Sequence, residues 1–403
     1  MWIDWLLGTA AGGLLVPSAT LGVQVWMSGR VQPHTSPTPP DGSAIPPTRR
    51  GLLTVLIPAH NEAEGIGRTL ASIAPQLAEG DDVLVVADNC NDHTAERARE
   101  AGARVCERHN LDLRGKGYAL DYGVRWIEAQ ARQPELVVFL DADCLLEPNS
   151  LDLLAHDAAR LGTAVQSLDL MRAPAGAPLQ TRVAEFAWLV KNQVRPLGMR
   201  AMGLPCQLMG TGMAIPWKLV QKAPLASGAL AEDVELGLFL AESGHAPVFC
   251  PQACVISEFP TGAANTVAQR RRWEHGHLSM IVKRGLPMLG GALKRLNKAQ
   301  FAMALDICVP PLASLVAALF GASIAFAVWA LAGGSSVPAL LAVTGLGIVT
   351  VSVLSAWHRY ARHVISGQEL MSIPGYIVRK LPLYWDAIRG RRAAWQRARR
   401  DRD

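Results

Sequence analysis

The stretch Val137–Asn149 reads VVFLDADCLLEPN and joins a short apolar run to two acidic residues. The run ends at Leu140, and Asp141 and Asp143 follow directly. An apolar run of this length predicts a buried strand. A single Asp at a strand end is commonly a turn or cap residue, but in an extended chain residues i and i+2 project to the same side, where two carboxylates repel unless a cation lies beside them. The spacing therefore predicts a site for a hard divalent ion with oxygen ligands.

The hydropathy of the chain is higher than that of a soluble domain, and the excess lies at the two ends of the chain. The 403 residues are 50% hydrophobic and 18% charged, and the mean hydropathy of +0.18 is high for a soluble domain. Three uncharged runs, Trp5–Met27, Ile307–Ala332 and Val337–Trp357, are each long enough to cross a bilayer at roughly 20 residues per crossing. The first run lacks the basic start of a signal peptide, so we expect a retained helix. The short linker between the other two predicts a transmembrane hairpin.

Basic residues border these runs on one side. Positive charge at the cytoplasmic ends of membrane helices predicts that residues 28–306 and the C-terminal tail are cytoplasmic. This placement accounts for most of the net charge of +5, and we expect membrane lipid rather than nucleic acid as the partner. The basic residues are Arg49, Arg50, Lys294, Arg295, Lys298, Arg359 and Arg362, followed by an Arg-rich tail.

Between the membrane segments, short apolar runs alternate with helical patterns. This alternation predicts an α/β domain with a mostly parallel sheet covered by helices on both faces. Ligands bind such sheets beyond the carboxyl ends of the strands. The predicted strands are 53–58, 82–87, 105–107 and 136–140, and the predicted helices are 61–77, 92–101 and 118–130.

Polar clusters lie where these strands end or helices begin. They are residues 58–62, 88–94, 114–118 and 141–143. Together they supply carboxylates for a metal, the ammonium of Lys116, and backbone amides at helix starts, which attract anions. This inventory suits a nucleoside diphosphate bound through a divalent ion.

Six motifs in order resemble those of family 2 glycosyltransferases, the inverting enzymes with a Rossmann-like GT-A fold. The motifs are IPAHNE at 57–62, ADNCNDHTA at 87–95, RGKGYAL at 114–120, DAD at 141–143, AED at 231–233 and QRRRW at 269–273. The resemblance covers roughly residues 51–280 and extends to membrane-bound exopolysaccharide synthases and cellulose-synthase-like enzymes. It implies a cytoplasmic domain that uses a nucleotide sugar, most often a UDP-sugar, with Mg²⁺ or Mn²⁺.

The resemblance also implies roles for individual residues. On the donor side, Pro58, Ala59 and Glu62 would line the nucleotide pocket, Asp88 would contact uracil, Lys116 would lie near the base or phosphates, Asp141 would face the ribose and diphosphate, and Asp143 would bind the metal. On the acceptor side, Asp233 matches the catalytic base, Gln269, Arg272 and Trp273 match the QxxRW motif, and Gly210, Thr211 and Gly212 match an acceptor loop.

The resulting hypothesis is a multi-pass enzyme of the bacterial inner membrane. We expect transfer of a sugar to a hydroxyl of a growing or polyprenyl-linked glycan in exopolysaccharide biosynthesis, with polysaccharide export proteins as candidate partners. A processive homopolymer synthase and an inactive nucleotide-binding scaffold subunit are the alternatives. We expect interfacial helices at Phe186–Leu208, Ser279–Leu296 and Ile373–Trp395, with ordinary packing as the alternative. The expected domains are a membrane helix (1–30), a linker (31–50), the GT-A domain (51–280), an interfacial helix region (281–300), two membrane helices (301–358) and a basic tail (359–403).

Overall fold

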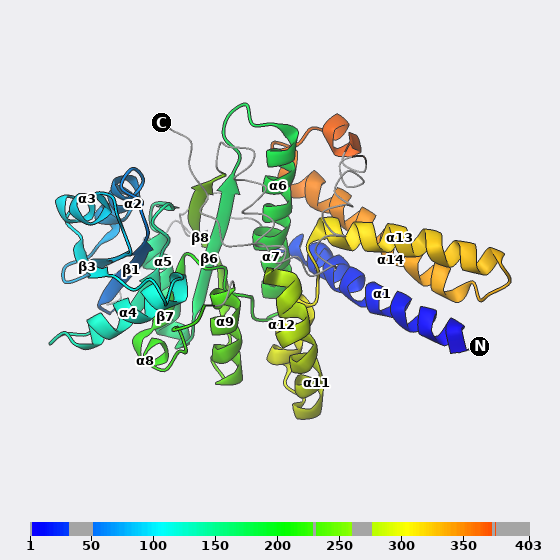
Figure 1. Ribbon diagram of the computed structural model, residues 1–403, viewed down its shortest axis with the longest axis horizontal. Coiled ribbons are helices and arrows are strands. Elements are labelled where there is room, and N and C mark those ends of the chain that lie inside the picture. The colour runs from blue at the N-terminus through cyan, green and yellow to red at the C-terminus, as the bar shows by residue number, and fades with distance from the viewer. Residues whose placement is uncertain (1, 32–50, 229–230, 260–275, 373–374, 376–403) are drawn as a thin grey trace. The chain divides into compact units, whose positions relative to one another are not determined.

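The computed structural model describes residues 2–31, 51–228, 231–259, 276–372 and 375 (Figure 1). The chain divides into two compact units, which we call the sheet unit and the helical unit. The sheet unit comprises Gln32–Arg172 and Leu204–Glu258, and the helical unit comprises Met1–Val31, Ala173–Gly203 and Phe259–Asp403.

The sheet unit contains one eight-stranded sheet with the order β3-β2-β1-β4-β7-β6-β8-β5. The strands are β1 Leu53–Ala59, β2 Asp82–Asp88, β3 Arg104–Arg108, β4 Leu136–Phe139, β5 Leu145–Leu146, β6 Val165–Arg172, β7 Met213–Pro216 and β8 Val248–Glu258. The first four strands are mutually parallel, whereas β7 runs antiparallel to both β4 and β6. The predicted α/β class is confirmed, and the carboxyl ends of β1 to β4 share one edge.

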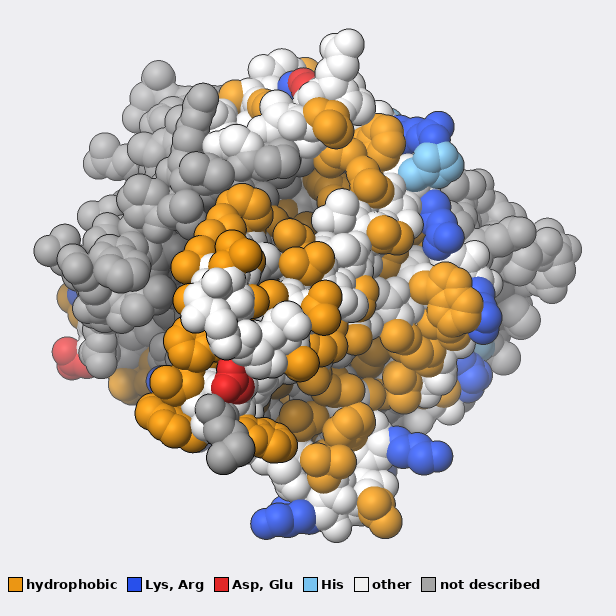
Figure 2. All heavy atoms as spheres, turned by 90° about the vertical axis from the view of Figure 1, so that its right-hand side faces the viewer, with side chains coloured by type: hydrophobic (Ala, Val, Ile, Leu, Met, Phe, Trp, Pro, Cys, Tyr) orange, Lys and Arg blue, Asp and Glu red, His pale blue; other side chains and the backbone are white. Residues whose placement is uncertain are grey.

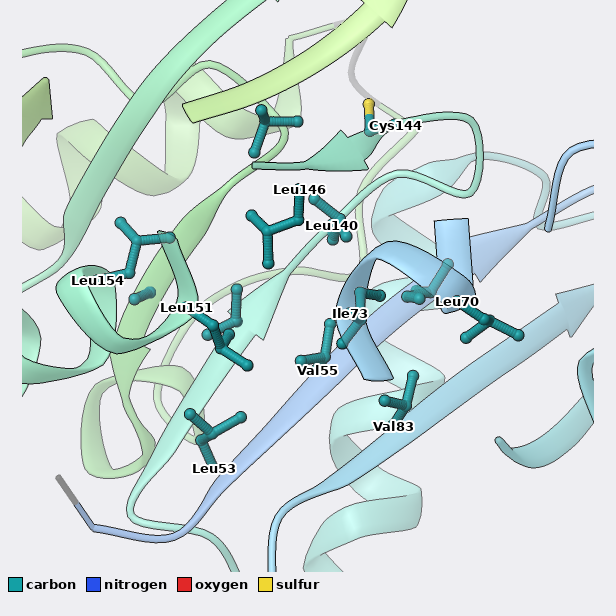
Figure 3. Packing of buried hydrophobic residues seen from close by; sticks show 14 of the residues in the cluster. Leu53, Val55, Leu70, Ile73, Val83, Leu140, Cys144, Leu146, Leu151 and Leu154 are labelled. Atoms are coloured by element: carbon teal, nitrogen blue, oxygen red, sulfur yellow. The ribbon is translucent and has the colours of Figure 1, made fainter. Parts of the chain in front are cut away.

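Helices cover both faces of this sheet, as predicted. They are α2 Ile66–Ile73, α3 Thr94–Glu100, α4 Lys116–Glu128, α5 Ser150–Leu161, α8 Trp217–Val220 and α9 Glu232–Glu242. Successive strand residues point to opposite faces. Val55 therefore belongs to the core beneath α2 and α5, and Leu56 belongs to the core beneath α4 and α9. Figure 3 shows the first core, with Leu70 and Ile73 of α2 and Leu151 and Leu154 of α5 among its members.

One predicted helix is shorter than expected. The helix predicted at 61–77 is α2, which begins only at Ile66 and ends in a 3-10 turn, Ala74–Gln76. Asn61 has a φ of +55°, and the next two backbone N–H groups donate to Thr94 Oγ1 and Asp92 Oδ2. These amides tie the segment after β1 to the one after β2, so residues 61–65 form a loop at the strand ends.

The helical unit holds the apolar segments. Its helices are α1 Trp2–Ser28, α6 Leu179–Leu189, α7 Arg195–Ala201, α11 Leu286–Arg295, α12 Lys298–Ile307, α13 Leu312–Leu331 and α14 Val337–Ala356, with π-helical turns at Val190–Val194, Ile281–Gly285 and Trp357–Ala361. Within the described residues, three helices are long and apolar enough to cross a membrane: Trp2–Ser28, Leu312–Leu331 and Val337–Ala361.

Hydrogen bonds join both ends of α1 to the C-terminal hairpin. Asp4 Oδ1 accepts from Trp329 Nε1 at 3.0 Å and from the backbone N–H of Ser335 at 2.9 Å. At the other end, Tyr360 Oη donates to the carbonyl oxygen of Ser28 at 3.0 Å. The start of α1 therefore lies beside the α13–α14 turn, so α1 runs parallel to α14 and antiparallel to α13, as three successive spans that alternate in direction require.

The segment predicted as an interfacial helix at Phe186–Leu208 differs from that expectation. Its helical part ends at Ala201, and its large apolar side chains are buried rather than exposed, so ordinary packing describes it. Those side chains are Phe186, Leu189, Val190, Leu197 and Met199. The segment Ile373–Trp395 lies outside the described residues, apart from Gly375.

Candidate active site

The two aspartates after β4 lie in a turn rather than in an extended chain. The backbone N–H of Cys144 donates to the carbonyl oxygen of Asp141 at 3.2 Å. Even so, a carboxylate oxygen of Asp141, one of Asp143 and the Cys144 sulfur all lie within 4.8 Å of one another. The predicted convergence of the two acids is present, but the turn produces it instead of strand pleating. Thr69 Oγ1 anchors the turn by donating to the carbonyl oxygen of Ala142 at 2.8 Å.

The chemistry of this donor set fits a hard divalent ion. Burial, together with the Asp143 and Asp141 carboxylates, raises the pKa of the Cys144 thiol well above its ordinary value. The thiol therefore stays protonated at neutral pH and is a poor metal ligand. Carboxylate oxygens remain, and these are the ligands that Mg²⁺ and Mn²⁺ prefer.

Lys116 binds the first of these acids. Its Nζ lies 2.5 Å from Asp141 Oδ1 and donates to the carbonyl oxygen of Gly210 at 2.9 Å. Burial disfavours the ammonium form, but the carboxylates of Asp141 and Glu232 outweigh burial and raise the pKa of Lys116. Lys116 begins α4, which can approach so closely because residue 117 is glycine: a Cβ there would lie 2.5 Å from the Leu225 carbonyl oxygen.

The loop at residues 209–212 connects Lys116 with the predicted base. Gly210 has a φ of +93°, and a Cβ at this position would lie 3.4 Å from Lys116 Nζ and 3.5 Å from Asp233 Oδ2. Asp233, in the first turn of α9, therefore flanks the same glycine as Lys116. Thr211 Oγ1 accepts from the backbone N–H of Asp141 at 3.1 Å. The structure thus brings together Asp141, Asp143, Lys116, Gly210, Thr211 and Asp233.

Glu232 extends the acidic character of the site. Burial raises the pKa of Glu232 to about 7, the Lys116 ammonium opposes this rise, and the neighbouring Asp233 carboxylate adds to it. A carboxyl group with such a pKa is partly protonated at neutral pH.

Gln166 was not predicted as a site residue from the sequence, yet its side chain holds the 209–212 loop in place. Its side chain is fully buried in β6. Its Nε2 donates to the Thr211 carbonyl oxygen at 2.9 Å, and its Oε1 accepts from the Met209 backbone N–H at 2.8 Å. The available signal was a glutamine that directly follows Val165 in a strand, because a buried amide needs partners. Gln166 positions residues that contact Lys116 and Asp141.

The predicted nucleotide end of the site lies where β1, β2 and β3 finish. The buried Asp88 carboxylate pairs with Arg108 at 2.6 Å, and His60 Nδ1 contacts the Asp88 carbonyl oxygen at 2.7 Å. Asp88 and Arg108 are direct partners in the β2–β3 register, a pairing that the sequence alone did not indicate. Ala59 is buried at the end of β1, Pro58 precedes it, and the backbone N–H of Glu62 donates to Thr94 Oγ1.

Three predicted site residues, Gln269, Arg272 and Trp273, lie outside the described residues. Their proposed roles stay predictions. The contribution of Gln269, Arg272 and Trp273 to the acceptor side therefore rests on the sequence resemblance alone.

A mixed α/β sheet with acids, a lysine and a glycine loop at the carboxyl ends of its strands defines a nucleotide-binding domain of the GT-A type. Residues 49–276, more than half of the chain, match the family model described as glycosyltransferase like family 2. The chain belongs to this family, and the resemblance seen in its motifs is confirmed.

Two curated relatives show the extent of the similarity. The chain is 31% identical over 206 residues to glucosyl-3-phosphoglycerate synthase of Mycolicibacterium paratuberculosis, covering 47% of this chain and 59% of the relative. It is 31% identical over 113 residues to 4,4'-diaponeurosporenoate glycosyltransferase of Staphylococcus haemolyticus, covering 27% of this chain and 28% of that relative. The chain thus spans less than two thirds of either relative.

One solved structure is similar over most of the chain. A mannosyltransferase of Pyrobaculum calidifontis, solved in complex with GDP-mannose and Mn²⁺, aligns with a TM-score of 0.53 and 21% identity, covering 88% of this chain and 98% of the other. At this identity the likeness supports the fold, and the GT-A architecture predicted from the motifs is confirmed.

Proposed function

We propose that this chain is a membrane-bound inverting glycosyltransferase that moves a sugar from a nucleotide sugar to a hydroxyl of a growing or polyprenyl-linked glycan in exopolysaccharide biosynthesis. The observation that carries the proposal is the grouping of Asp141, Asp143, Lys116 and Asp233 around Gly210, in a chain that also holds three helices apolar enough to cross a membrane.

The donor side needs compensation for the charge of a leaving diphosphate. Asp143 and Asp141 would hold Mg²⁺ or Mn²⁺, which when bound supplies Lewis-acid stabilisation of the diphosphate. Lys116 would add a direct positive charge, and charge-assisted hydrogen bonds of this kind are stronger than neutral ones. Pro58, Ala59, Glu62 and Asp88 would line the nucleoside pocket, and the resemblance favours a UDP-sugar.

The acceptor side needs a base. Asp233 lies beside Gly210, as Lys116 does, and its carboxylate would accept the proton of an incoming hydroxyl. A single base and a direct displacement give inversion at the anomeric carbon. Gly210, Thr211 and Gly212, with Gln269, Arg272 and Trp273, would hold the acceptor.

The proposed membrane location suits an acceptor carried by lipid. The hydrogen bonds of Asp4 to Trp329 and Ser335 put the start of α1 at the same end as the α13–α14 turn. With positive residues at the opposite ends, the proposed topology has the catalytic domain in the cytoplasm of a bacterial cell and the spans in the inner membrane. The proposed boundaries are those expected from the sequence, with the GT-A domain at 51–280.

The experiment is a donor screen with the full-length protein in lipid nanodiscs. UDP- and GDP-sugars are supplied with Mg²⁺ or Mn²⁺ and a polyprenyl-linked acceptor extract, and nucleoside diphosphate release and product mass are measured. One sugar added to a lipid-linked product supports the proposal. A ladder of products would favour the processive alternative, and nucleotide binding without turnover for every donor would favour the scaffold alternative.

A further inference from the structure

The corner between α11 and α12 exposes a leucine in an unfavourable conformation. Leu296 has a φ of +52° and is 86% exposed. Residues at this position after a helix are commonly Gly or Asn, because a side chain with a Cβ is strained in the left-handed region. In water, this leucine therefore carries both backbone strain and exposed apolar surface.

Leu296 continues an apolar stripe on one face of the helix before it. Val282, Leu286 and Leu293 are 66%, 55% and 58% exposed, and their spacing is that of one helical face. The face beside this stripe is packed within the helical unit, since a Cβ on Gly285 would lie 3.0 Å from the Cys308 sulfur. Among the described residues, the helix thus has a partner on that face, while the apolar stripe is exposed.

The charge around this stripe has one sign. Lys283, Lys294, Arg295 and Lys298 are exposed. From residue 276 to residue 311 the sequence contains a single carboxylate, Asp306, and this carboxylate is buried against Arg195 at 2.7 Å. The exposed charge beside the stripe is therefore positive, which suits an anionic partner with an apolar interior.

Chain length limits the distance between this corner and the first apolar span of the C-terminal hairpin. Only residues 308–311 separate the end of α12 from the start of α13, so at about 3.6 Å per residue the end of α12 lies within about 18 Å of the first residue of the span. The corner is at the other end of α12, about 15 Å further along the chain at about 1.5 Å per helical residue. Figure 1 shows α11 and α12 running across the direction of α13 and α14. Figure 2 shows a face on which hydrophobic side chains gather, with Lys and Arg side chains beside them.

We propose that the α11–α12 corner binds anionic phospholipid of the cytoplasmic leaflet. Leu293 and Leu296 enter the acyl region, and Lys294, Arg295 and Lys298 bind headgroup phosphates. A basic residue near an anionic membrane surface contributes about fivefold in binding. The inference rests on the proposed membrane location and does not depend on the proposed sugar transfer.

The test uses the full-length protein with Leu296→Cys in nanodiscs of phosphatidylcholine alone or with phosphatidylglycerol. A membrane-impermeant maleimide labels the protein, and mass analysis of the peptide containing residue 296 gives the labelling rate, so the native cysteines do not interfere. Lys222→Cys, an exposed position of the sheet unit, reports the rate in water. We expect residue 296 to label about tenfold more slowly in phosphatidylglycerol discs than in phosphatidylcholine discs.

Two triple variants test the charge requirement. K294Q/R295Q/K298Q should remove the protection given by phosphatidylglycerol, whereas R97Q/R132Q/K218Q, which removes the same charge from exposed positions of the sheet unit, should retain it. Equal protection in both lipids would mean a contact without anionic selectivity and would overturn the inference. Labelling as fast as residue 222 in both lipids would mean a corner facing water, which would also overturn it. Neither outcome bears on sugar transfer, which the donor screen measures separately.

Discussion

Lys116 and Asp141 form an ion pair with 2.5 Å between Nζ and Oδ1, joining the first turn of α4 to the turn after β4. The same ammonium is stabilised by the carboxylates of Glu232 and Asp233, and Asp143 lies beside Asp141. Several acids therefore share one lysine in this part of the described structure. Such a site has an excess of negative charge, and a divalent cation would neutralise it.

Lys116→Met should weaken binding of the donor nucleotide. Loss of a charge-assisted hydrogen bond of about 1.5–3 kcal/mol corresponds to roughly 10- to 100-fold in affinity. Isothermal titration with UDP and GDP in the presence of Mn²⁺ measures this change. Lys116→Arg keeps the charge and should lose less, and equal affinity of Lys116→Met and the unaltered protein would exclude Lys116 from the diphosphate site.

Asp143→Asn should raise the metal concentration needed for half-maximal activity and lower activity by about 100-fold or more, because a metal contributes several kcal/mol of charge stabilisation. Titration of EDTA-treated protein with Mn²⁺ checks this. Asp112→Asn, an exposed acid in the loop before α4, is the matched control. A Mn²⁺ titration identical for the two variants would contradict a metal role for Asp143.

Asp233→Asn should abolish transfer while leaving donor binding intact. General-base catalysis contributes about 10²- to 10⁴-fold, so kcat should fall by this factor and UDP affinity should change less than about twofold. Glu235→Gln removes an acid from the same helical turn and should retain activity. Full activity of Asp233→Asn would show that another group accepts the proton.

The buried carboxyl of Glu232 should make stability depend on pH. Its pKa is raised to about 7 from an ordinary 4.5, so between these values the folded state binds a proton that the unfolded state does not. This group's contribution is therefore present below about pH 4.5, falls as pH rises to about 7, and levels off above.

Glu232→Gln removes this dependence. The Tm of the metal-free protein, measured across pH 4.5–8, should fall less steeply for Glu232→Gln than for the unaltered protein. Glu79→Gln, an exposed acid, should keep the steeper slope. Parallel curves for all three proteins would refute a raised pKa at Glu232.

Removing one partner of a buried ion pair should destabilise the helical unit. Arg195 Nη2 lies 2.7 Å from Asp306 Oδ1, and Gln24 of α1 donates to the same oxygen at 2.7 Å. Asp306→Leu alone would leave a buried guanidinium without its carboxylate, at a cost of about 3–5 kcal/mol. The double variant R195M/D306L should recover most of that loss in detergent Tm. No recovery would mean that the residues act independently.

Most strands and apolar helices of the fold could be predicted from hydrophobic periodicity. The strands at 53–58, 82–87 and 136–140 were predicted within one or two residues, because uninterrupted apolar runs and polar strand ends are local properties. The three apolar helices were predicted for the same reason. The helix at 61–77 was too long, because the amides of Glu62 and Ala63 bind side chains about 30 residues away, and no local pattern records that.

The sequence by itself determined the class of the domain, its apolar segments and the residue types that gather at the strand ends, since these follow from composition and spacing. Only the tertiary structure decided that Lys116 pairs with Asp141, that Asp88 pairs with Arg108, and that Gln166 holds the loop beside Asp233. Each of these contacts joins residues distant in the chain. Their partners are fixed by strand order, turn geometry and close glycine packing, which arise when the whole sheet assembles.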